Sequence, residues 1–208
     1  MNFDRRALFG AFAGTLLVGA ALLPVSGAIA APAPAADPAH QAILTTKDGK
    51  ILIQLRPDLA PNHVKQIETL ISQKFYDGIV FHRVIEDFMA QTGDPTGTGG
   101  GGSKLPNLKA EFTNEPYERG TVGMARTQDP DSANSQFFIT YSKVSSLNGK
   151  YTVVGQVISG MDVVDKIKKG SNAANGSVSD PDKIISFRMA NETPAKAAKP
   201  APAMKSAK

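Results

Sequence analysis

The chain has 208 residues, of which 41% are hydrophobic and 20% charged, so a folded domain with extensions is expected and wholesale disorder is excluded. It contains no cysteine, which excludes disulfides, thiolate metal sites and a cysteine nucleophile. The net charge of +4 arises at the two ends, because residues 31–189 hold 17 basic and 17 acidic side chains. A neutral domain lacks the clustered positive charge that binds phosphates, so no nucleic-acid partner is expected.

Residues 1–30 have the features of a cleavable export signal. Arg5 and Arg6 precede an uncharged run, Ala7–Leu23, and Ala28–Ala30 supplies the small residues that signal peptidase requires. We therefore expect cleavage after residue 30 and a periplasmic or otherwise exported protein without a permanent membrane span. A retained membrane anchor is the alternative, but this run is short for the ~20 residues of a bilayer-spanning helix.

Two segments rich in Ala and Pro flank the expected domain. Residues 31–39 form an extended spacer that has little to bury, and residues 191–208 form an Ala/Pro/Lys tail that we expect to be disordered. The folded domain is therefore predicted over residues 40–190. No internal repeat is visible, and we expect a monomer.

In chain order, the first predicted elements are a hairpin and a helix. Strands over Ala42–Thr46 and Ile51–Leu55 flank an Asp-Gly turn, which accepts positive φ at low cost. A helix is expected from Pro61 to about Gln73, because apolar residues recur there at helical spacing.

The rest of the domain is predicted to be mostly strands. We expect six of them, over residues 79–85, 88–91, 121–125, 135–141, 151–158 and 183–188. A glycine-rich loop interrupts them at residues 93–102. A second helix is expected between Gly160 and Gly170, with acids in its early turns and lysines in its last. About eight strands and two helices, without strand–helix alternation, favour a mainly β fold, an antiparallel barrel or sandwich covered by two helices.

The motifs for cofactor, metal and nucleophile chemistry are weak. Gly97–Gly102 formally matches a dinucleotide-binding pattern, but no helix follows it to hold a pyrophosphate. His40, His63 and His82 are scattered without metal-ligand spacing, and no serine stands in a G-x-S-x-G motif. We therefore expect no cofactor, no metal and no nucleophilic hydrolysis.

The segment Ser135–Tyr141 has one face that needs a different explanation. Strand alternation divides its side chains into a core-like set, Phe137, Ile139 and Tyr141, and a mixed set, Gln136, Phe138 and Thr140. An amide beside a large aromatic ring suits neither a dry core nor a wet surface. Met89 and Gln91 repeat this combination, and Arg83 lies on the preceding predicted strand. Together these residues describe an apolar pocket with a polar rim, which suits a neutral, amide-containing ligand.

Six short motifs then occur in a specific order along the chain. They are Phe81–Ile85, Phe88–Gln91, Gly93–Asp94, Met124–Arg126, Ser135–Ile139 and Leu147–Gly155. In this order they resemble the cyclophilin family of peptidyl-prolyl isomerases, over about residues 42–189. The resemblance implies a closed eight-stranded antiparallel barrel capped by two α-helices. It also implies a peptidyl-prolyl cis-trans isomerase that accelerates rotation about X-Pro bonds and assists the folding of exported proteins, with proline-containing polypeptides as partners.

The resemblance extends to individual site residues. Arg83 matches the catalytic arginine of the family. The proline pocket and its polar rim are matched by Phe88, Met89, Phe138, Leu147, Gln91 and Gln136. Ala125 and Arg126 match the segment whose backbone aligns the substrate, and Tyr151 stands where animal cyclophilins carry His.

Two departures from the family pattern qualify this assignment. Ser146 replaces the Trp that contacts cyclosporin, so weak binding of that drug is expected. Glu86 and Asp87 replace a Pro-Gly turn, which should alter local stiffness more than chemistry. The alternative function is a non-catalytic proline-peptide binding module or holdase that uses the same groove; the retained Arg83 and Phe138 favour the isomerase.

Overall fold

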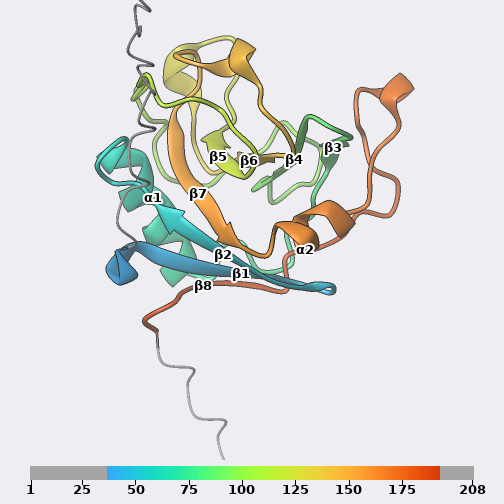
Figure 1. Ribbon diagram of the computed structural model, residues 1–208, viewed down its shortest axis with the longest axis horizontal. Helices are drawn as coiled ribbons and strands as arrows, with labels where there is room; N and C mark the ends of the chain where they lie inside the picture. The colour runs from blue at the N-terminus through green and yellow to red at the C-terminus, as the bar shows by residue number, and fades with distance from the viewer. Residues whose placement is uncertain (1–36, 193–208) are drawn as a thin grey trace, which may run out of the picture. The chain divides into compact units, whose positions relative to one another are not determined.

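The computed structural model describes residues 37–192. The predicted signal segment, most of the spacer and the tail beyond residue 192 lie outside these residues. The strands are β1 (Gln41–Thr46), β2 (Gly49–Leu55), β3 (Arg83–Ile85), β4 (Met89–Thr92), β5 (Thr121–Met124), β6 (Phe137–Thr140), β7 (Val153–Ser159) and β8 (Ser186–Met189). They form one antiparallel sheet in the order β3-β4-β6-β5-β7-β2-β1-β8 (Figure 1).

The sheet is an open half-barrel, so the expectation of a closed barrel was wrong. Its edge strands, β3 and β8, do not pair with each other. The predicted strand over residues 79–85 is regular only from Arg83. The segments that precede β3 and β8 are joined by the isolated bridge Val80–Lys183 and by a few backbone hydrogen bonds, without forming strands. The edge of β3 is instead occupied by a loop, because Val84 exchanges backbone hydrogen bonds with Gly170 and Gly176.

The predicted hairpin is confirmed with a shorter turn. Thr46 pairs with Gly49, which leaves Lys47 and Asp48 as a two-residue loop. Gly49 has φ +144°, and a Cβ there would lie 2.9 Å from a methyl group of Val163. The glycine therefore lets the tip of the hairpin approach the second helix.

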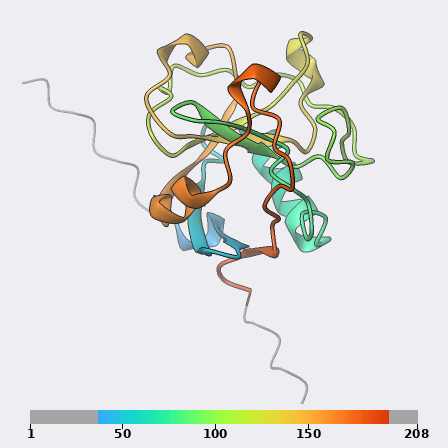
Figure 2. The ribbon, with the colours of Figure 1, turned by 90° about the vertical axis from the view of Figure 1, so that its right-hand side faces the viewer.

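Two helices cover the half-barrel from different sides (Figures 1 and 2). Helix α1 (Pro61–Ser72) begins with proline at its first turn, where a missing N–H costs nothing. Helix α2 (Met161–Lys166) is shorter than predicted, because Ile167 is already extended. Among residues 37–192, no helix is long and apolar enough to span a membrane.

The main hydrophobic core fills the inside of the half-barrel and takes residues from both helices. It includes Phe137 and Ile139 of β6, Ile67 of α1 and Val164 of α2, all at most 2% exposed. A second apolar cluster lies apart from it and consists of Met89, Tyr117, Phe138, Leu147 and Val153. The alternation predicted for residues 135–141 is confirmed, since Phe137 and Phe138 belong to different clusters.

Candidate active site

The register of the sheet brings three predicted site residues into one row. Arg83 on β3 lies opposite Gln91 on β4, and Gln91 lies opposite Phe138 on β6. Directly opposed residues project their side chains from the same face, and neighbouring strands are about 4.8 Å apart. The guanidinium, the amide and the aromatic ring therefore share one face, opposite the main core.

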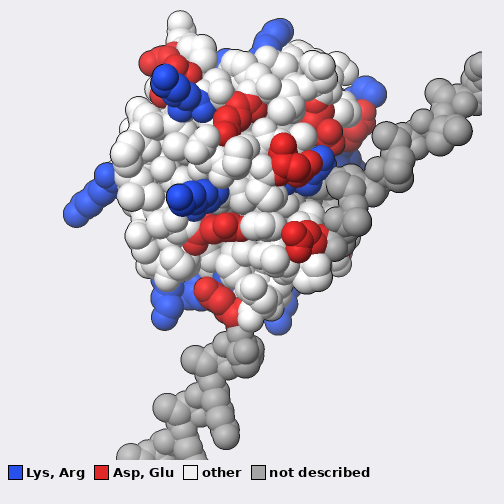
Figure 3. Space-filling model, turned by 90° about the vertical axis from the view of Figure 1, so that its left-hand side faces the viewer, with Lys and Arg blue, Asp and Glu red and all other residues white. Residues whose placement is uncertain are grey.

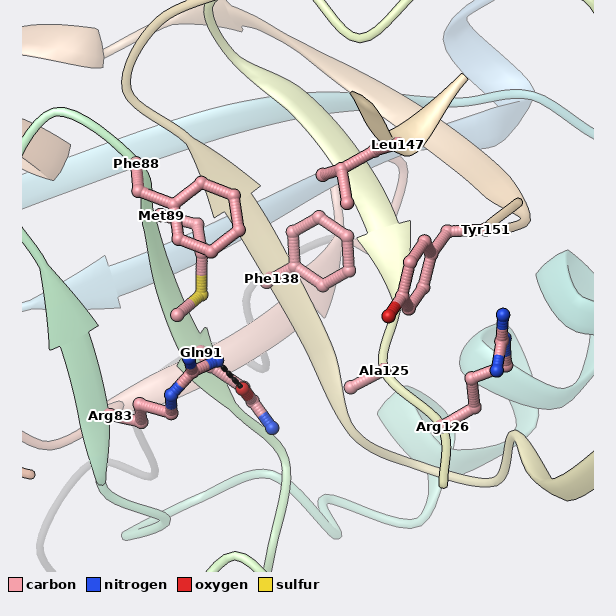
Figure 4. A pocket seen from close by; sticks show the side chains of 9 residues that line it. All are labelled: Arg83, Phe88, Met89, Gln91, Ala125, Arg126, Phe138, Leu147 and Tyr151. Atoms are coloured by element: carbon pink, nitrogen blue, oxygen red, sulfur yellow. Dashed lines mark hydrogen bonds between the residues drawn. The ribbon is translucent and has the colours of Figure 1, made fainter. Parts of the chain in front are cut away.

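A hollow of about 100 Å³ opens on this face (Figure 4). Its lining consists of Arg83, Phe88, Met89, Gln91, Ala125, Arg126, Phe138, Leu147 and Tyr151. These are nine of the ten residues that the sequence nominated. The tenth, Gln136, lines an adjoining hollow of about 350 Å³ that shares Gln91, Ala125 and Arg126 with the first.

The floor and walls of the hollow are apolar. Met89 and Phe138 are 1% and 5% exposed and form the floor, while Leu147 is brought in by the 3-10 turn η3 (Ser145–Leu147). The ring of Tyr151 meets Phe138 edge-on, with centroids 5.9 Å apart. An apolar ring entering this hollow would be held by side chains that are themselves fixed by packing.

Behind the floor, Tyr117 and Gly123 set the position of Phe138. The Tyr117 ring stacks on Phe138 at 5.8 Å. Its hydroxyl is buried and has no hydrogen-bond partner among residues 37–192, and burial raises the pKa of Tyr117. Gly123 lies opposite Phe138 on β5, and a Cβ there would come within 2.7 Å of the Phe138 ring. The glycine makes room for both rings. Neither residue is predicted from the sequence, because neither lies in a motif of its own.

A chain of hydrogen bonds forms the polar rim. Arg83 Nη1 donates to Gln91 Oε1 at 3.2 Å, and Gln91 Nε2 donates to Gln136 Oε1 at 2.9 Å. Gln136 Nε2 donates in turn to the carbonyls of Gly99 and Gly101, at 2.9 and 2.8 Å. The two predicted rim amides are therefore linked to each other, to the arginine and to the glycine-rich loop.

The loop itself is organised by Asp94, which is 1% exposed. Burial alone would raise the pKa of its carboxyl. Hydrogen bonds from the N–H groups of Thr96, Gly101 and Gly99 and from the hydroxyl of Thr96 outweigh this effect and lower the pKa to about 2. The carboxylate thus gathers the loop whose carbonyls hold Gln136. Asp94 lies within a motif of the resemblance, which implies no role for it.

Arg83 has a further partner that the sequence analysis missed. Its Nε donates to the backbone carbonyl of Asn175 and its Nη2 to the Oδ1 of the same residue, both at 3.0 Å. Burial lowers the pKa of the Arg83 guanidinium, but arginine stays protonated in proteins. The Asn-Gly pair at residues 175–176 signals a turn, although nothing local indicates that this turn meets β3, 92 positions away.

Arg126 stands beside the hollow with its guanidinium directed away from it (Figure 4). The guanidinium lies over the rings of Tyr151 and Phe112, at 4.5 and 5.9 Å from their centroids. Its nitrogens donate to the carbonyls of Lys150 and Thr127, at 2.9 and 2.8 Å. The side chain therefore braces the wall that carries Tyr151.

The histidines that the sequence analysis set aside lie elsewhere. His40 Nδ1 is 2.7 Å from Glu68, and His63 Nδ1 is 2.6 Å from Glu111, whose carboxylate also accepts the backbone N–H of His63 at the start of α1. His82 is buried, and burial lowers its pKa. Within residues 37–192, no group of three or more His, Cys, Asp or Glu side chains could hold a metal ion.

A β half-barrel with an apolar hollow and an arginine at its rim is the arrangement of a peptidyl-prolyl isomerase of the cyclophilin type. The family model described as "Cyclophilin type peptidyl-prolyl cis-trans isomerase/CLD" matches residues 41–189. The chain therefore belongs to this family and is a peptidyl-prolyl cis-trans isomerase, and the family binds proline-containing peptides.

Similar proteins agree with this assignment. A probable peptidyl-prolyl cis-trans isomerase of Brucella suis is 52% identical over 204 residues, which cover 93% of this chain and all of the relative. A cyclophilin of Hirschia baltica has a TM-score of 0.68 at 28% identity, covering 77% of each chain. A Cryptosporidium parvum cyclophilin, solved in the presence of the dipeptide Ala-Pro, has a TM-score of 0.66 at 30% identity and covers 72% of this chain and 98% of its own.

Proposed function

We propose that this isomerase holds the proline ring of its substrate against Phe138 and Met89 while Arg83 stabilises the twisted X-Pro amide. The row Arg83–Gln91–Phe138 carries this proposal, because it puts a guanidinium at the edge of an apolar hollow. The reaction makes and breaks no covalent bond, so these side chains need only bind and polarise the amide.

The barrier to be lowered comes from amide resonance and is about 18–20 kcal/mol. Twisting the C–N bond localises the lone pair on the proline nitrogen. Donors that meet the twisted form better than the planar form accelerate the rotation. A reduction of about 5–8 kcal/mol corresponds to about four to six decades in rate.

Arg83 has donors left for this task. A guanidinium carries five N–H groups, and three of them donate to Gln91 and Asn175. The other two, one on each Nη, have no acceptor among residues 37–192. They are available to the prolyl carbonyl and, in the twisted state, to the proline nitrogen.

Backbone groups beside the hollow can align the substrate. The N–H of Ala125 donates to Gln136, which holds the segment against β6. The carbonyl of Ala125 and the N–H of Arg126 take part in none of the hydrogen bonds among residues 37–192. An extended peptide lying across the hollow can pair with these two groups, in keeping with the role that the resemblance gives to this segment.

Replacing Arg83 tests the proposal. We expect Arg83→Ala to lower kcat/KM on an Ala-Pro peptide by about two to three decades, the usual cost of removing one preorganised donor. Arg83→Lys keeps the charge but not the planar set of donors, so its kcat/KM should lie between those of Arg83→Ala and the wild type. Peptide binding, followed by NMR titration, should persist in both variants. Wild-type turnover in Arg83→Ala would remove the arginine from the mechanism.

We also propose that the protein is exported and assists the folding of exported proteins. The charged start, the uncharged run Ala7–Leu23 and the small residues at Ala28–Ala30 support this. N-terminal sequencing of the protein from its native cells should give Ala31 as the first residue of the mature form. A mature protein that still begins at Met1 and stays in the cytosol would contradict export.

Three narrower proposals concern partners. Ser146 is exposed in η3, beside Leu147 of the hollow, and offers little surface to cyclosporin. We expect Ser146→Trp to bind the drug more tightly than the wild type in a calorimetric titration, and an unchanged affinity would contradict the role of this position.

Acidic and basic side chains are interspersed on the face shown in Figure 3, consistent with a protein that does not bind nucleic acid. A monomer is expected by light scattering.

A further inference from the structure

The loop that follows α2 lies against β3, the strand that carries Arg83 (Figures 1 and 2). Gly170 N–H donates to the Val84 carbonyl at 2.9 Å, and Val84 N–H donates to the Gly176 carbonyl at 2.8 Å. A Cβ on Gly176 would clash with Ile85, and a Cβ on Gly170 would clash with the carbonyl of Gly176. The loop is therefore held close to β3, and its backbone packs too tightly there to accept a side chain at either glycine.

At the turn of this loop, Asn175 has the left-handed conformation, with φ 52° and ψ 37°. Asparagine adopts this conformation more readily than most residues. The turn directs both the backbone carbonyl and the side-chain Oδ1 of Asn175 toward Arg83, each accepting a hydrogen bond of 3.0 Å. Asn175 thus supplies two of the three acceptors that Arg83 has among the described residues.

We propose that Asn175 is a positioning residue of the isomerase, which holds the Arg83 guanidinium so that its two remaining donors face the hollow. This inference rests on the function proposed above. A free arginine side chain samples many rotamers, and fixing it in one orientation costs entropy. Anchors on Nε and Nη2 fix the plane of the fork before the substrate arrives.

The chemistry of the side chain fits this role. A neutral amide oxygen orients the cation without neutralising it, so the charge remains available to the twisted amide. Aspartate would keep the geometry but add a carboxylate that competes with the substrate carbonyl for the same cation. Glycine would keep the left-handed turn but remove the acceptor. Asparagine combines the neutral acceptor with the backbone conformation.

Three single variants test the inference. Asn175→Gly keeps the turn and removes one hydrogen bond, and we expect kcat to fall about tenfold with peptide affinity unchanged. Asn175→Asp should lower kcat about a hundredfold by pairing with the arginine. Asn172→Ala is the matched control, because Asn172 is exposed in the same loop and its side chain forms no hydrogen bond within residues 37–192. It should behave as the wild type.

Two further measurements separate positioning from general stability. In an Arg83→Ala background, Asn175→Asp should cause no additional loss, whereas an equal loss in both backgrounds would overturn the inference. The Nη2 protons of Arg83, observed by 15N NMR, should rotate faster in Asn175→Gly than in the wild type, and unchanged rotation would contradict the anchor. Thermal unfolding confirms that each variant is folded at the assay temperature.

The outcomes also distinguish the two proposals. If Arg83→Ala retains full activity, the proposed function of the arginine fails. If Arg83→Ala is inactive while Asn175→Gly and Asn175→Asp turn over as the wild type, the positioning role fails alone.

Discussion

Phe137 and Phe138 are neighbours on β6, and both are almost fully buried, but they face opposite sides of the sheet. Phe137 packs against Tyr76 and Phe187 inside the half-barrel, with ring centroids 5.6 and 5.9 Å apart. Phe138 packs between Tyr117 and Tyr151 and forms the floor of a hollow. Burial alone therefore does not separate an aromatic residue of the main core from one that lines the hollow; the face of the strand does.

The two clusters also differ in the surroundings of their tyrosine hydroxyls. In the main core, the hydroxyl of Tyr76 donates to the carbonyl of Ser135, at 3.1 Å. In the outer cluster, the buried hydroxyl of Tyr117 has no hydrogen-bond partner in the part of the chain that the structure describes. An unsatisfied buried hydroxyl costs about 1–3 kcal/mol. The hydroxyl of Tyr117 therefore carries a cost that the hydroxyl of Tyr76 avoids.

Replacing each phenylalanine with alanine is the strongest test of the difference between Phe137 and Phe138. Phe137→Ala should lower the free energy of unfolding by about 3–5 kcal/mol, as expected for a large cavity in the core. At temperatures where it is folded, it should turn over substrate within a few-fold of the wild type. Urea unfolding and an NMR exchange assay on an Ala-Pro peptide measure both quantities.

Phe138→Ala should show the reverse pattern. We expect a smaller loss of stability, about 2–3 kcal/mol, because one side of the ring borders the hollow. The loss in kcat/KM should be about a hundredfold or more, since the proline ring loses its floor. Equal activity losses in the two variants would show that the faces of β6 do not divide structure from function.

The polar rim offers a smaller test, through the pH dependence of Asp94. Its folded pKa of about 2 lies below its ordinary value of 3.8, so the ionised carboxylate stabilises the fold at pH values above about 4. This contribution, about 2 kcal/mol, is lost as the pH falls from about 4 to 2. Asp94→Asn should therefore be less stable than the wild type at pH 7.

The difference in stability between Asp94→Asn and the wild type should become smaller at low pH, because the wild-type carboxylate is then protonated. Thermal unfolding between pH 7 and pH 2 measures this gap, and a parallel decline of both proteins would contradict the role of the carboxylate. The variant should also lower kcat/KM a few-fold, because the loop that holds Gln136 loosens. Thr45→Ser is the control, because Thr45 lies on β1, near the end of the sheet that is opposite β3 and β4, and its pH dependence should match that of the wild type.

Local signals in the sequence were sufficient for much of the fold. The Asp-Gly pair predicted the first hairpin, and alternation over residues 135–141 predicted which side of β6 Phe138 would face. Sequence analysis could not predict that the half-barrel stays open, because the loop that occupies the edge of β3 comes from residues 170–177. Where a sheet ends depends on which distant segments form hydrogen bonds with the backbone groups of its edge strand.

The candidate site shows the same division. The resemblance nominated the residues that line the hollow. The strand register brings Arg83, Gln91 and Phe138 together, while turns and segments beside the strands bring in the others. Asn175 and Gly123 were missed, because their importance comes from what lies opposite them: Arg83 for the first, Phe138 for the second. Single positions without chemically reactive side chains gain a role only through the pairing of distant segments.

The row that joins Arg83, Gln91 and Phe138 crosses three strands and depends on every pairing between them. A shift of one residue in any pairing would turn part of the row to the opposite face. A sheet in which β3, β4 and β6 have not yet paired in register therefore lacks this row. During refolding, turnover should return only once these three strands have paired in register, so the recovery of activity reports the assembly of β3, β4 and β6.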